Sequence, residues 1–363
     1  MKAKDVKRMD RMTSSSEQFI LENVRVERNE LKRTVRCLSC DQTQMRSFPV
    51  HMRKFHPAEW EICCQDFLRL YNQGNSLSQI MKRYGTLFTW KVIDREIKRV
   101  AEKNGIIIKA RPTTVKDLAP KKFTLECSSV WRFPKRGNWA VHDGSYRGNW
   151  APQVPRNLIL HYTRKGDTVV DPFVGGGTTL IECVLLKRKG IGVDISPHAV
   201  NITRQKLREL RKSMPKQDIE FPRVFRCDAR HLSMITDESV DFVCGQPPYA
   251  NAVRYTSSIS EDLSRIGSLS QFCAQIREVA RELYRVLKKR KRCAVLVGDV
   301  RRKKMVFPLG FKVMEQFLAQ DFDLEEIIVK EQHNDRSTRF YATKPSVLRF
   351  RIAHEYLFVF KKR

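Results

Sequence analysis

The sequence Asp171-Pro-Phe-Val-Gly-Gly-Gly-Thr-Thr179 indicates the fold class, because it joins a short apolar strand pattern to a helix pattern through a run of glycines. Glycine lets the backbone turn sharply and approach a ligand with no Cβ in the way. The free N–H groups at the start of the following helix suit a carboxylate. The sequence therefore predicts a small-molecule site at this turn, with candidate cofactor-binding residues Asp171, Pro172, Phe173, Gly175, Gly177 and Thr178.

Strand patterns and amphipathic helix patterns alternate from this turn toward the C-terminus. Alternation of this kind is typical of an α/β fold, in which helices cover both faces of a parallel sheet. Ligands of such sheets lie beyond the carboxyl ends of the strands, so residues at those ends should meet. The predicted strands span 167–173, 191–195, 223–228, 239–245 and 293–299, and the predicted helices span 178–190, 197–211 and 271–289.

Two acidic residues stand at predicted strand ends. Asp194 ends the strand that follows the glycine turn, where an acidic residue can hold ribose hydroxyls, and Asp228 ends the next strand and could reach an adenine amine. The turn lacks the G-x-G-x-x-G pattern of dinucleotide sites, and no Gly-Lys-Ser/Thr follows the glycines as in a P-loop. A tight strand-to-helix turn without a ligand remains the alternative for the turn taken alone.

A second motif, Gln246-Pro247-Pro248-Tyr249, directly follows the predicted strand at 239–245. Together with the Asp-Pro-Phe-x-Gly-x-Gly-Thr-Thr turn it resembles the amino-methylating DNA methyltransferases, which modify N4 of cytosine or N6 of adenine. Residues 144–167 resemble the family segment that completes the pocket for S-adenosylmethionine (SAM), and residues 352–362 resemble its terminal strand. The resemblance covers roughly residues 123–363 and implies a Rossmann-like SAM-dependent methyltransferase sheet with SAM as the cofactor.

The resemblance assigns catalytic roles to the residues of this motif. An exocyclic amine is a poor nucleophile because its lone pair is delocalised into the ring. In the family, the first side chain of the motif and the carbonyl of the next residue accept its N–H groups and free that lone pair. The prolines fix the backbone, and the aromatic residue stacks on a base rotated out of the duplex. These roles fall to Gln246, Pro247, Pro248 and Tyr249.

Gln246 departs from the family pattern, which usually has Asp, Asn or Ser at this position. Its amide oxygen is still an acceptor, but the longer side chain could shift the base or mark an inactive site. Adenine and cytosine both remain open as the modified base. Further candidates for substrate contact are Asn251, Arg254, Tyr255 and Asp299, and the basic stretches 298–305 and 332–340 could grip phosphates.

The N-terminal part has the ligand types of a zinc site, in the spacing Cys37-x2-Cys40-x10-His51-x4-His56. It resembles prokaryotic Ros-type Cys2His2 zinc fingers, and the resemblance implies a structural zinc ion. Downstream, a capping box at Ser76 and a third helix at 90–103 indicate a helix-turn-helix-like module. That third helix could enter a major groove, and its basic residues are Lys91, Arg95, Lys98 and Arg99. The alternative to the zinc site is that these four residues are unrelated. The alternative to the helix-turn-helix-like module is a generic three-helix packing unit.

These patterns divide the chain into five predicted segments. A polar lead-in, frayed or helical, is followed by a Cys2His2-like zinc finger, a helix-turn-helix-like DNA-binding module, a linker and the methyltransferase domain. Their predicted bounds are 1–30, 31–62, 63–110, 111–122 and 123–363.

The composition favours a nucleic-acid partner. A formal net charge of +29 repels itself unless a polyanion balances it. No apolar run reaches the roughly 18 residues of a membrane span, and the N-terminal residues lack a signal-peptide pattern. Ten cysteines fit a reducing compartment if a few bind metal. We therefore expect a cytoplasmic, DNA-associated protein.

The leading hypothesis is a site-specific methyltransferase that acts on double-stranded DNA, as in restriction–modification systems, with the N-terminal module as the reader. One alternative is an RNA guanine-N2 methyltransferase, since those enzymes also carry Asp-Pro-Phe and Pro-Pro-Tyr-type motifs. The other is a DNA-binding regulator on an inactive methyltransferase scaffold.

Overall fold

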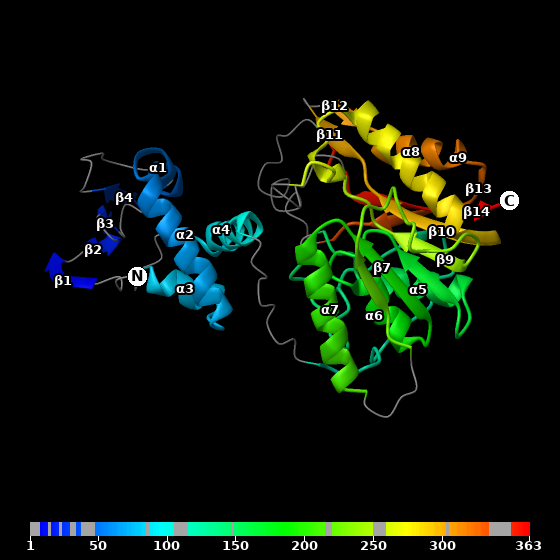
Figure 1. Ribbon diagram of the computed structural model, residues 1–363, viewed down its shortest axis with the longest axis horizontal. Helices are drawn as coiled ribbons and strands as arrows, with labels where there is room; N and C mark the ends of the chain where they lie inside the picture. Colours follow the sequence, from blue (N-terminus) through cyan, green and yellow to red (C-terminus); the bar gives the residue numbers. More distant parts are fainter. Residues whose placement is uncertain are drawn as a thin grey trace. The chain divides into compact units, whose positions relative to one another are not determined.

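The computed structural model describes residues 48–84, 88–104, 115–146, 148–214, 220–249, 259–302, 305–333 and 350–363, and the backbone of 8–13, 16–21, 24–29 and 34–37. The chain divides into two units, Met1–Arg111 and Pro112–Arg363, and each is taken by itself (Figure 1). None of the described helices combines the length and apolar character that crossing a membrane requires.

The N-terminal unit begins with an antiparallel sheet where the sequence predicted a frayed or helical lead-in. Alternation in Val24-Arg-Val-Glu27 has the period of two that favours a strand. The register places Phe19 opposite Val26 and Ile20 opposite Arg25. The strands pair in the order β1 (Arg8–Thr13), β2 (Ser16–Leu21), β3 (Val24–Asn29) and β4 (Thr34–Cys37).

The helices of this unit share one core. The predicted capping box is confirmed, because the Ser76 side chain accepts from the Gln79 N–H and the Gln79 side chain accepts from the Ser76 N–H. The predicted boundary at 62/63 falls inside one helix, and Phe48 of the predicted finger is buried with Phe67 of the predicted module. The two predicted segments therefore pack as one body. Its helices are α1 (Phe48–Phe55), α2 (Pro57–Asn72), α3 (Leu77–Arg83) and α4 (Trp90–Lys103).

Basic residues of the predicted third helix, α4, are engaged within their own unit. Arg99 donates to Glu61 and to Glu96 at 2.7 Å, and Arg95 donates to Glu96 at 2.9 Å. Glu96 is buried, so these guanidinium groups supply the positive charge that a buried carboxylate requires. This part of the helix serves internal packing, and its insertion into a major groove stays a prediction.

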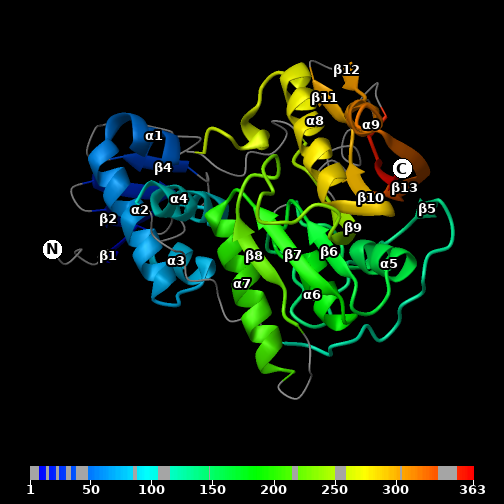
Figure 2. The ribbon, with the colours of Figure 1, turned by 45° about the vertical axis from the view of Figure 1, so that its right-hand side comes forward.

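The second unit is built on an eight-stranded, mostly parallel sheet (Figures 1 and 2). Its central strands are parallel, whereas β14 runs antiparallel to both of its neighbours, β10 and β13. The prediction of a parallel sheet therefore holds for the part that carries the glycine turn. In spatial order the strands are β5 (Val130–Trp131), β13 (Phe322–Glu331), β14 (His354–Lys362), β10 (Leu287–Val297), β9 (Val240–Gly245), β6 (Thr168–Asp171), β7 (Lys189–Asp194) and β8 (Arg223–Arg226).

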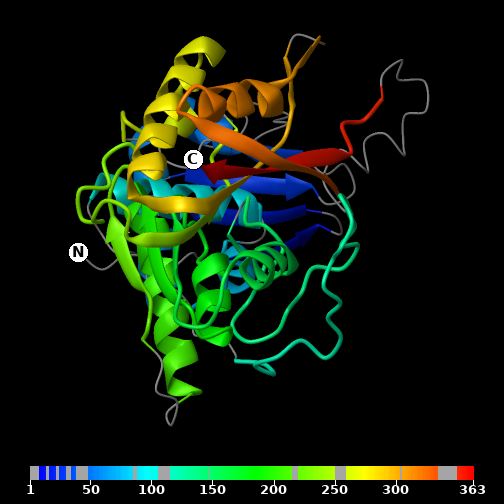
Figure 3. The same ribbon diagram turned by 90° about the vertical axis from the view of Figure 1, so that its right-hand side faces the viewer.

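Helices cover both faces of this sheet (Figure 3). Neighbouring strand residues alternate between two cores, so that Val170 packs with Phe272 while Val169 packs with Leu158. One face is covered by α5 (Gln153–Tyr162), α6 (Thr178–Leu185) and α7 (Pro197–Lys212), and the other by α8 (Leu269–Val286) and α9 (Leu309–Leu318). Shorter elements are the 3₁₀ turn η2 (Leu263–Arg265) and the hairpin of β11 (Val300–Arg302) and β12 (Met305–Phe307).

Two predicted helices end earlier than expected. The helix predicted for 178–190 ends at Leu185, because Lys187 takes a left-handed φ of 61° and the chain enters β7 at Lys189. The helix predicted for 271–289 ends at Val286, and the basic run that follows belongs to β10. Pairing of Leu287 with β9 overrides the helical pattern there.

The second half of the predicted linker belongs to the second unit. Backbone hydrogen bonds join the Lys116 N–H to the Ala140 carbonyl at 2.9 Å and the Ala140 N–H to the Asp117 carbonyl at 2.7 Å. Val115 and Leu118 pack against the core that contains Trp139. The methyltransferase unit therefore begins before the predicted residue 123.

Candidate functional site

A cleft lies at the carboxyl ends of the parallel strands of the second unit. Its volume is about 780 Å³ including the open mouth. The turn after β6, the ends of β7 and β9, and the segment after β8 all contribute to its walls. Of the predicted site residues, it brings together Asp171, Pro172, Phe173, Gly175, Asp194, Asp228, Gln246 and Pro248.

Asp171 holds the start of the glycine turn from the end of β6. Its carboxylate accepts the Phe173 N–H at 2.9 Å and the hydroxyl of Thr179 on α6. The side chain is buried, and this burial raises the pKa of Asp171 to about 7. Strand, turn and helix are thus tied together by one carboxyl group.

Asp194 holds the other side of the turn from the end of β7. One oxygen accepts the Gly175 N–H and the other accepts the Ser196 N–H, both at 2.9 Å. Burial raises the pKa of Asp194 to about 6. A carboxylate has about four lone-pair positions, so each oxygen can still accept a ligand hydroxyl.

The turn favours glycine at two positions. Gly175 and Gly177 both have left-handed φ values, 48° and 79°. A Cβ at Gly177 would lie 2.9 Å from Cγ2 of Thr203, whose hydroxyl donates to the Gly175 carbonyl. Gly177 and Thr178 lie at the N-cap and first position of α6, so they shape the turn from behind rather than line the cleft.

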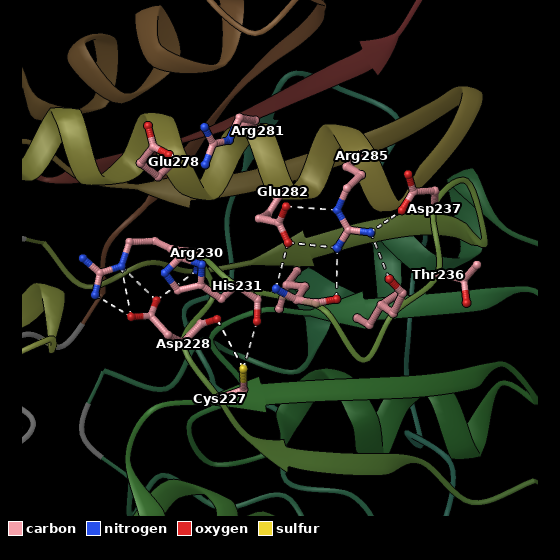
Figure 4. A network of polar contacts seen from close by, with 12 residues as sticks. Cys227, Asp228, Arg230, His231, Thr236, Asp237, Glu278, Arg281, Glu282 and Arg285 are labelled. Atoms are coloured by element: carbon pink, nitrogen blue, oxygen red, sulfur yellow. Dashed lines mark hydrogen bonds and ion pairs between the residues drawn. The ribbon is translucent and has the colours of Figure 1, made fainter.

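Asp228 lines the cleft, but its carboxylate already has a cationic partner (Figure 4). Nε of Arg230 lies 2.9 and 3.0 Å from the two carboxylate oxygens of Asp228. The backbone N–H of Arg230 donates to one of these oxygens at 2.9 Å. The same guanidinium donates to the Glu261 carbonyl at 3.0 Å. Sequence reasoning missed Arg230, since no periodic pattern marks an ion pair two residues apart.

The proline-framed motif sits at the end of β9. Gln246 and Pro248 line the cleft, whereas Pro247 lines a smaller apolar pocket beneath it with Phe173. The Tyr249 ring packs against the core beside the cleft, and its hydroxyl donates to Glu355 at 2.6 Å. Nε2 of Gln246 donates to the same hydroxyl at 2.9 Å.

A segment between β5 and β6 completes the cleft, and sequence reasoning named it only as the stretch 144–167. Tyr146, Asn149 and Trp150 line the cleft, and Asn149 accepts from the Thr178 hydroxyl at 2.6 Å. Arg-Gly-Asn-Trp-Ala occurs at both 136–140 and 147–151, a repetition that could have drawn attention to this segment.

Buried polar groups anchor that segment to the helices. Glu182 of α6 accepts from Trp139 at 2.8 Å and from Arg156 at 2.7 Å. Lys206 of α7 is buried and donates to Asp143 at 3.0 Å and to the Gly176 carbonyl at 3.3 Å. The wall of the cleft and the glycine turn are therefore fixed to the same two helices.

The remaining predicted substrate contacts lie elsewhere. Asp299 accepts the Gly310 N–H at 3.0 Å at the start of α9 and does not line the cleft. The stretch 298–305 contains β11 and the first residue of β12, with residues 303–304 outside the described ranges. Also outside the described residues lie Asn251, Arg254, Tyr255 and residues 334–340.

The predicted zinc ligands are only partly described. Cys40 lies outside the described residues, and Cys37 is described by its backbone in β4. His51 is buried in α1, and its ring centroid lies 5.3 Å from that of His56 at the start of α2. Within the ranges that the structure covers, no three His, Cys, Asp or Glu side chains group as metal ligands.

Known proteins match parts of this chain. A tRNA (guanine(10)-N2)-dimethyltransferase from Methanothermobacter thermautotrophicus is 35% identical over 121 residues, 33% of this chain and 33% of that protein. The Type II methyltransferase M.MjaI of Methanocaldococcus jannaschii is 42% identical over 82 residues, 22% of this chain and 26% of that protein. The chain thus spans a third or less of the length of either relative.

Comparison with solved structures and with family models adds two findings. A SAM-dependent methyltransferase from Methanosarcina mazei has a TM-score of 0.40 at 14% identity, over 56% of this chain and 96% of that one. The family model N6_N4_Mtase, described as DNA methylase, matches residues 34–205 and 240–363. These residues include the glycine turn and the Gln246–Tyr249 motif. Because the match extends over most of the sequence, the chain belongs to the DNA methylase family.

Proposed function

We propose that the protein transfers a methyl group from SAM to an exocyclic amino group, N4 of cytosine or N6 of adenine, of a flipped base in double-stranded DNA. One observation carries the proposal: Gln246 and Pro248 line the same cleft as Asp171, Gly175 and Asp194. A methyl donor at the glycine turn and an amine at Gln246 would therefore share one enclosed space. The family and the net charge of +29 support a DNA-associated, cytoplasmic enzyme.

The residues of the cleft fit SAM in their chemistry. The free lone pairs of Asp194 suit ribose hydroxyls, and Tyr146, Phe173 and Leu263 offer apolar surface. Carboxyl groups at the strand ends give the cleft an acidic floor beside a cationic ligand. When bound, SAM supplies a methyl group on a positively charged sulfur, which is activated for transfer to a nucleophile.

The chain's own residues prepare the amine. The Oε1 atom of Gln246 and the Pro247 carbonyl are the two acceptors for its N–H groups, which localises the nitrogen lone pair. Proline at 247 and 248 restricts the backbone so that this carbonyl keeps its direction. Tyr249 contributes the aromatic face for the extruded base.

The direct test is to incubate the protein with labelled SAM and with duplex DNA or transfer RNA in parallel, and to identify the methylated nucleoside after digestion. We expect N4-methylcytosine or N6-methyladenine from the DNA. Label in N2-methylguanosine of the RNA would favour the RNA alternative, which the likeness to a tRNA (guanine(10)-N2)-dimethyltransferase supports. DNA binding without transfer would favour a regulator on an inactive scaffold.

We also propose that the N-terminal unit selects the DNA sequence, with zinc held by Cys37, Cys40, His51 and His56. Burial, and then the neighbouring His56, lowers the pKa of His51, and the neutral imidazole is the form that binds metal. Cys37→Ala should release the metal and weaken DNA selection, measured by metal analysis and by competition between DNA sequences. Cys127→Ala, an exposed cysteine of the other unit, is the matched control. Unchanged selectivity in metal-free protein would rule out this role.

A further inference from the structure

A chain of hydrogen bonds runs from the cleft into the sheet through four side chains. Nε2 of Gln246 donates to the Tyr249 hydroxyl at 2.9 Å, and that hydroxyl donates to Oε1 of Glu355 at 2.6 Å. Oε2 of Glu355 accepts from Nζ of Lys330 at 2.7 Å. Glu355 lies on β14 and Lys330 on β13, so the chain links the end of β9 to the antiparallel part of the sheet.

The donors and acceptors in this chain permit one arrangement. Glu355 is buried, and each of its two carboxyl oxygens accepts a hydrogen bond, one from Tyr249 and one from the Lys330 ammonium group. The Tyr249 hydroxyl has a single proton, which it donates to Glu355, so it can only accept from Gln246. The Gln246 amide must therefore turn its NH₂ toward Tyr249, which leaves Oε1 at the other end of the amide.

Packing restricts the same groups. A Cβ at Gly298, just after β10, would lie 3.2 Å from Cε2 of Tyr249 and 3.4 Å from Cγ of Glu355. The Tyr249 ring and the Glu355 side chain therefore both lie close to the backbone at the end of the central strand. Oε1 of Gln246 has no hydrogen-bond partner among the described residues, and the side chain lines the cleft.

We propose that Glu355 and Lys330 are positioning residues that act through Tyr249 to turn the acceptor atom of Gln246 toward the target amine. The inference rests on the proposed function and deepens it. An aspartate at position 246 would present an acceptor whichever way its carboxylate turned. A glutamine presents an acceptor at one end only, so this site needs a device that orients the amide.

The orientation can be measured without catalysis. In full-length protein, NMR can detect the side-chain NH₂ of Gln246, whose signals are identified by their loss in Gln246→Glu. We expect their chemical shifts to differ from those of free glutamine. Tyr249→Phe, which keeps the ring and removes the hydroxyl, should move them toward the free position. Glu331→Gln on β13, outside the chain of contacts, is the matched control and should leave them in place. Unmoved signals in Tyr249→Phe would overturn the inference.

Kinetics provide a second readout through a double-mutant cycle. Tyr249→Phe should lower kcat about five- to tenfold, the loss expected for one oriented hydrogen bond, and should leave the Kd for SAM unchanged. In the Gln246→Glu background both ends of the side chain are acceptors, so Tyr249→Phe should change kcat by less than about twofold. If Tyr249→Phe lowered kcat by the same factor in the wild type and in Gln246→Glu, the orienting role would be contradicted.

Glu355→Gln extends the test to the carboxylate. An amide at 355 can donate to Tyr249, which lets Tyr249 donate to Oε1 of Gln246 and turns NH₂ toward the cleft. We expect kcat to fall at least tenfold, since hydrogen bonds to charged groups are stronger than neutral ones. If the wild-type protein transferred no methyl group to DNA, the result would contradict the proposed function alone. The NMR signals of Gln246 would still test whether Tyr249 orients its amide.

Discussion

The two sides of the cleft are built in different ways. On the cofactor side, Asp194 binds backbone N–H groups of Gly175 and Ser196, so the turn is held by main-chain atoms. On the target side, Gln246 is held by the hydroxyl of Tyr249, a contact between two side chains. Asp171 and Thr203 hold the same turn through further hydrogen bonds to its main chain, whereas the Gln246 amide has one side-chain hydrogen bond among the described residues. The target side should therefore be the easier of the two to switch off without unfolding the protein.

The largest effect is expected on the target side, from Tyr249→Ala. This change removes the aromatic face for the base and the hydroxyl that orients Gln246. Stacking alone is worth roughly 1–3 kcal/mol per base, so methyl transfer should fall about a hundredfold or more. SAM binding, measured by calorimetry, should stay near the wild-type value. A parallel loss of SAM binding would show that Tyr249 supports the cofactor side instead.

The next effect tests the buried carboxyl groups on the cofactor side. The pKa of Asp171 is raised by burial from 3.8 to about 7, so the folded protein holds this proton more tightly than the unfolded chain. Its stabilising contribution is present below about pH 4 and is lost as the pH rises through about 7. The contribution of Asp194 to stability has the same pH dependence and is lost as the pH rises through its own pKa of about 6.

Asp171→Asn removes one of these two titrations. Between pH 5 and pH 7 the wild type should lose about 2 kcal/mol more of its free energy of unfolding than the variant does, on the order set by the pKa shift. Urea denaturation at a series of pH values measures the two slopes, and comparing slopes cancels any constant cost of the substitution. If the free energy of unfolding changed equally with pH in the wild type and in the variant, Asp171 would be ionised in the folded protein throughout this range.

A smaller effect is expected from a methyl group on the glycine turn. Gly177→Ala would place a Cβ 2.9 Å from Thr203, the residue that holds the Gly175 carbonyl. Overpacking of this kind costs about 1–3 kcal/mol, and we expect the Kd for SAM to rise about tenfold. Gly166→Ala is the control, because Gly166 has a similar φ of 85° but no atom within 4 Å of its Cβ. Equal SAM affinities in the two variants would show that the turn does not position the cofactor.

Local patterns predicted most of the framework that carries the cleft. The strands around the turn and the motif lie within a few residues of their predicted positions, because buried parallel strands are short, apolar and bounded by turn residues. Eight of the predicted binding and catalytic residues line one cleft, as expected for residues at carboxyl ends of parallel strands. The ends of α6 and α8 were misplaced, since strand pairing sets where each helix stops.

The partners of these residues could not be predicted in the same way. Tyr249 and Glu355 are separated by 106 positions, and Lys330 by a further 25 from Glu355. Glu355 lies in the stretch 352–362, which the family resemblance marked only as a strand, and Lys330 stands in no motif. In the N-terminal unit, Arg99 pairs with Glu61, which lies 38 positions away on α2, so a basic helix face in the sequence did not show which charges remain available.

The glycine turn, the proline-framed motif and their places at strand ends could be predicted from the amino-acid sequence, because these features depend on backbone conformation and local periodicity. The groups around them became visible only in the folded protein: the Asn149 wall beside the glycine turn, and Glu355 with Lys330 behind Tyr249. Such contacts depend on which strands lie side by side in the sheet. That arrangement joins residues far apart in the chain, and no local pattern records it.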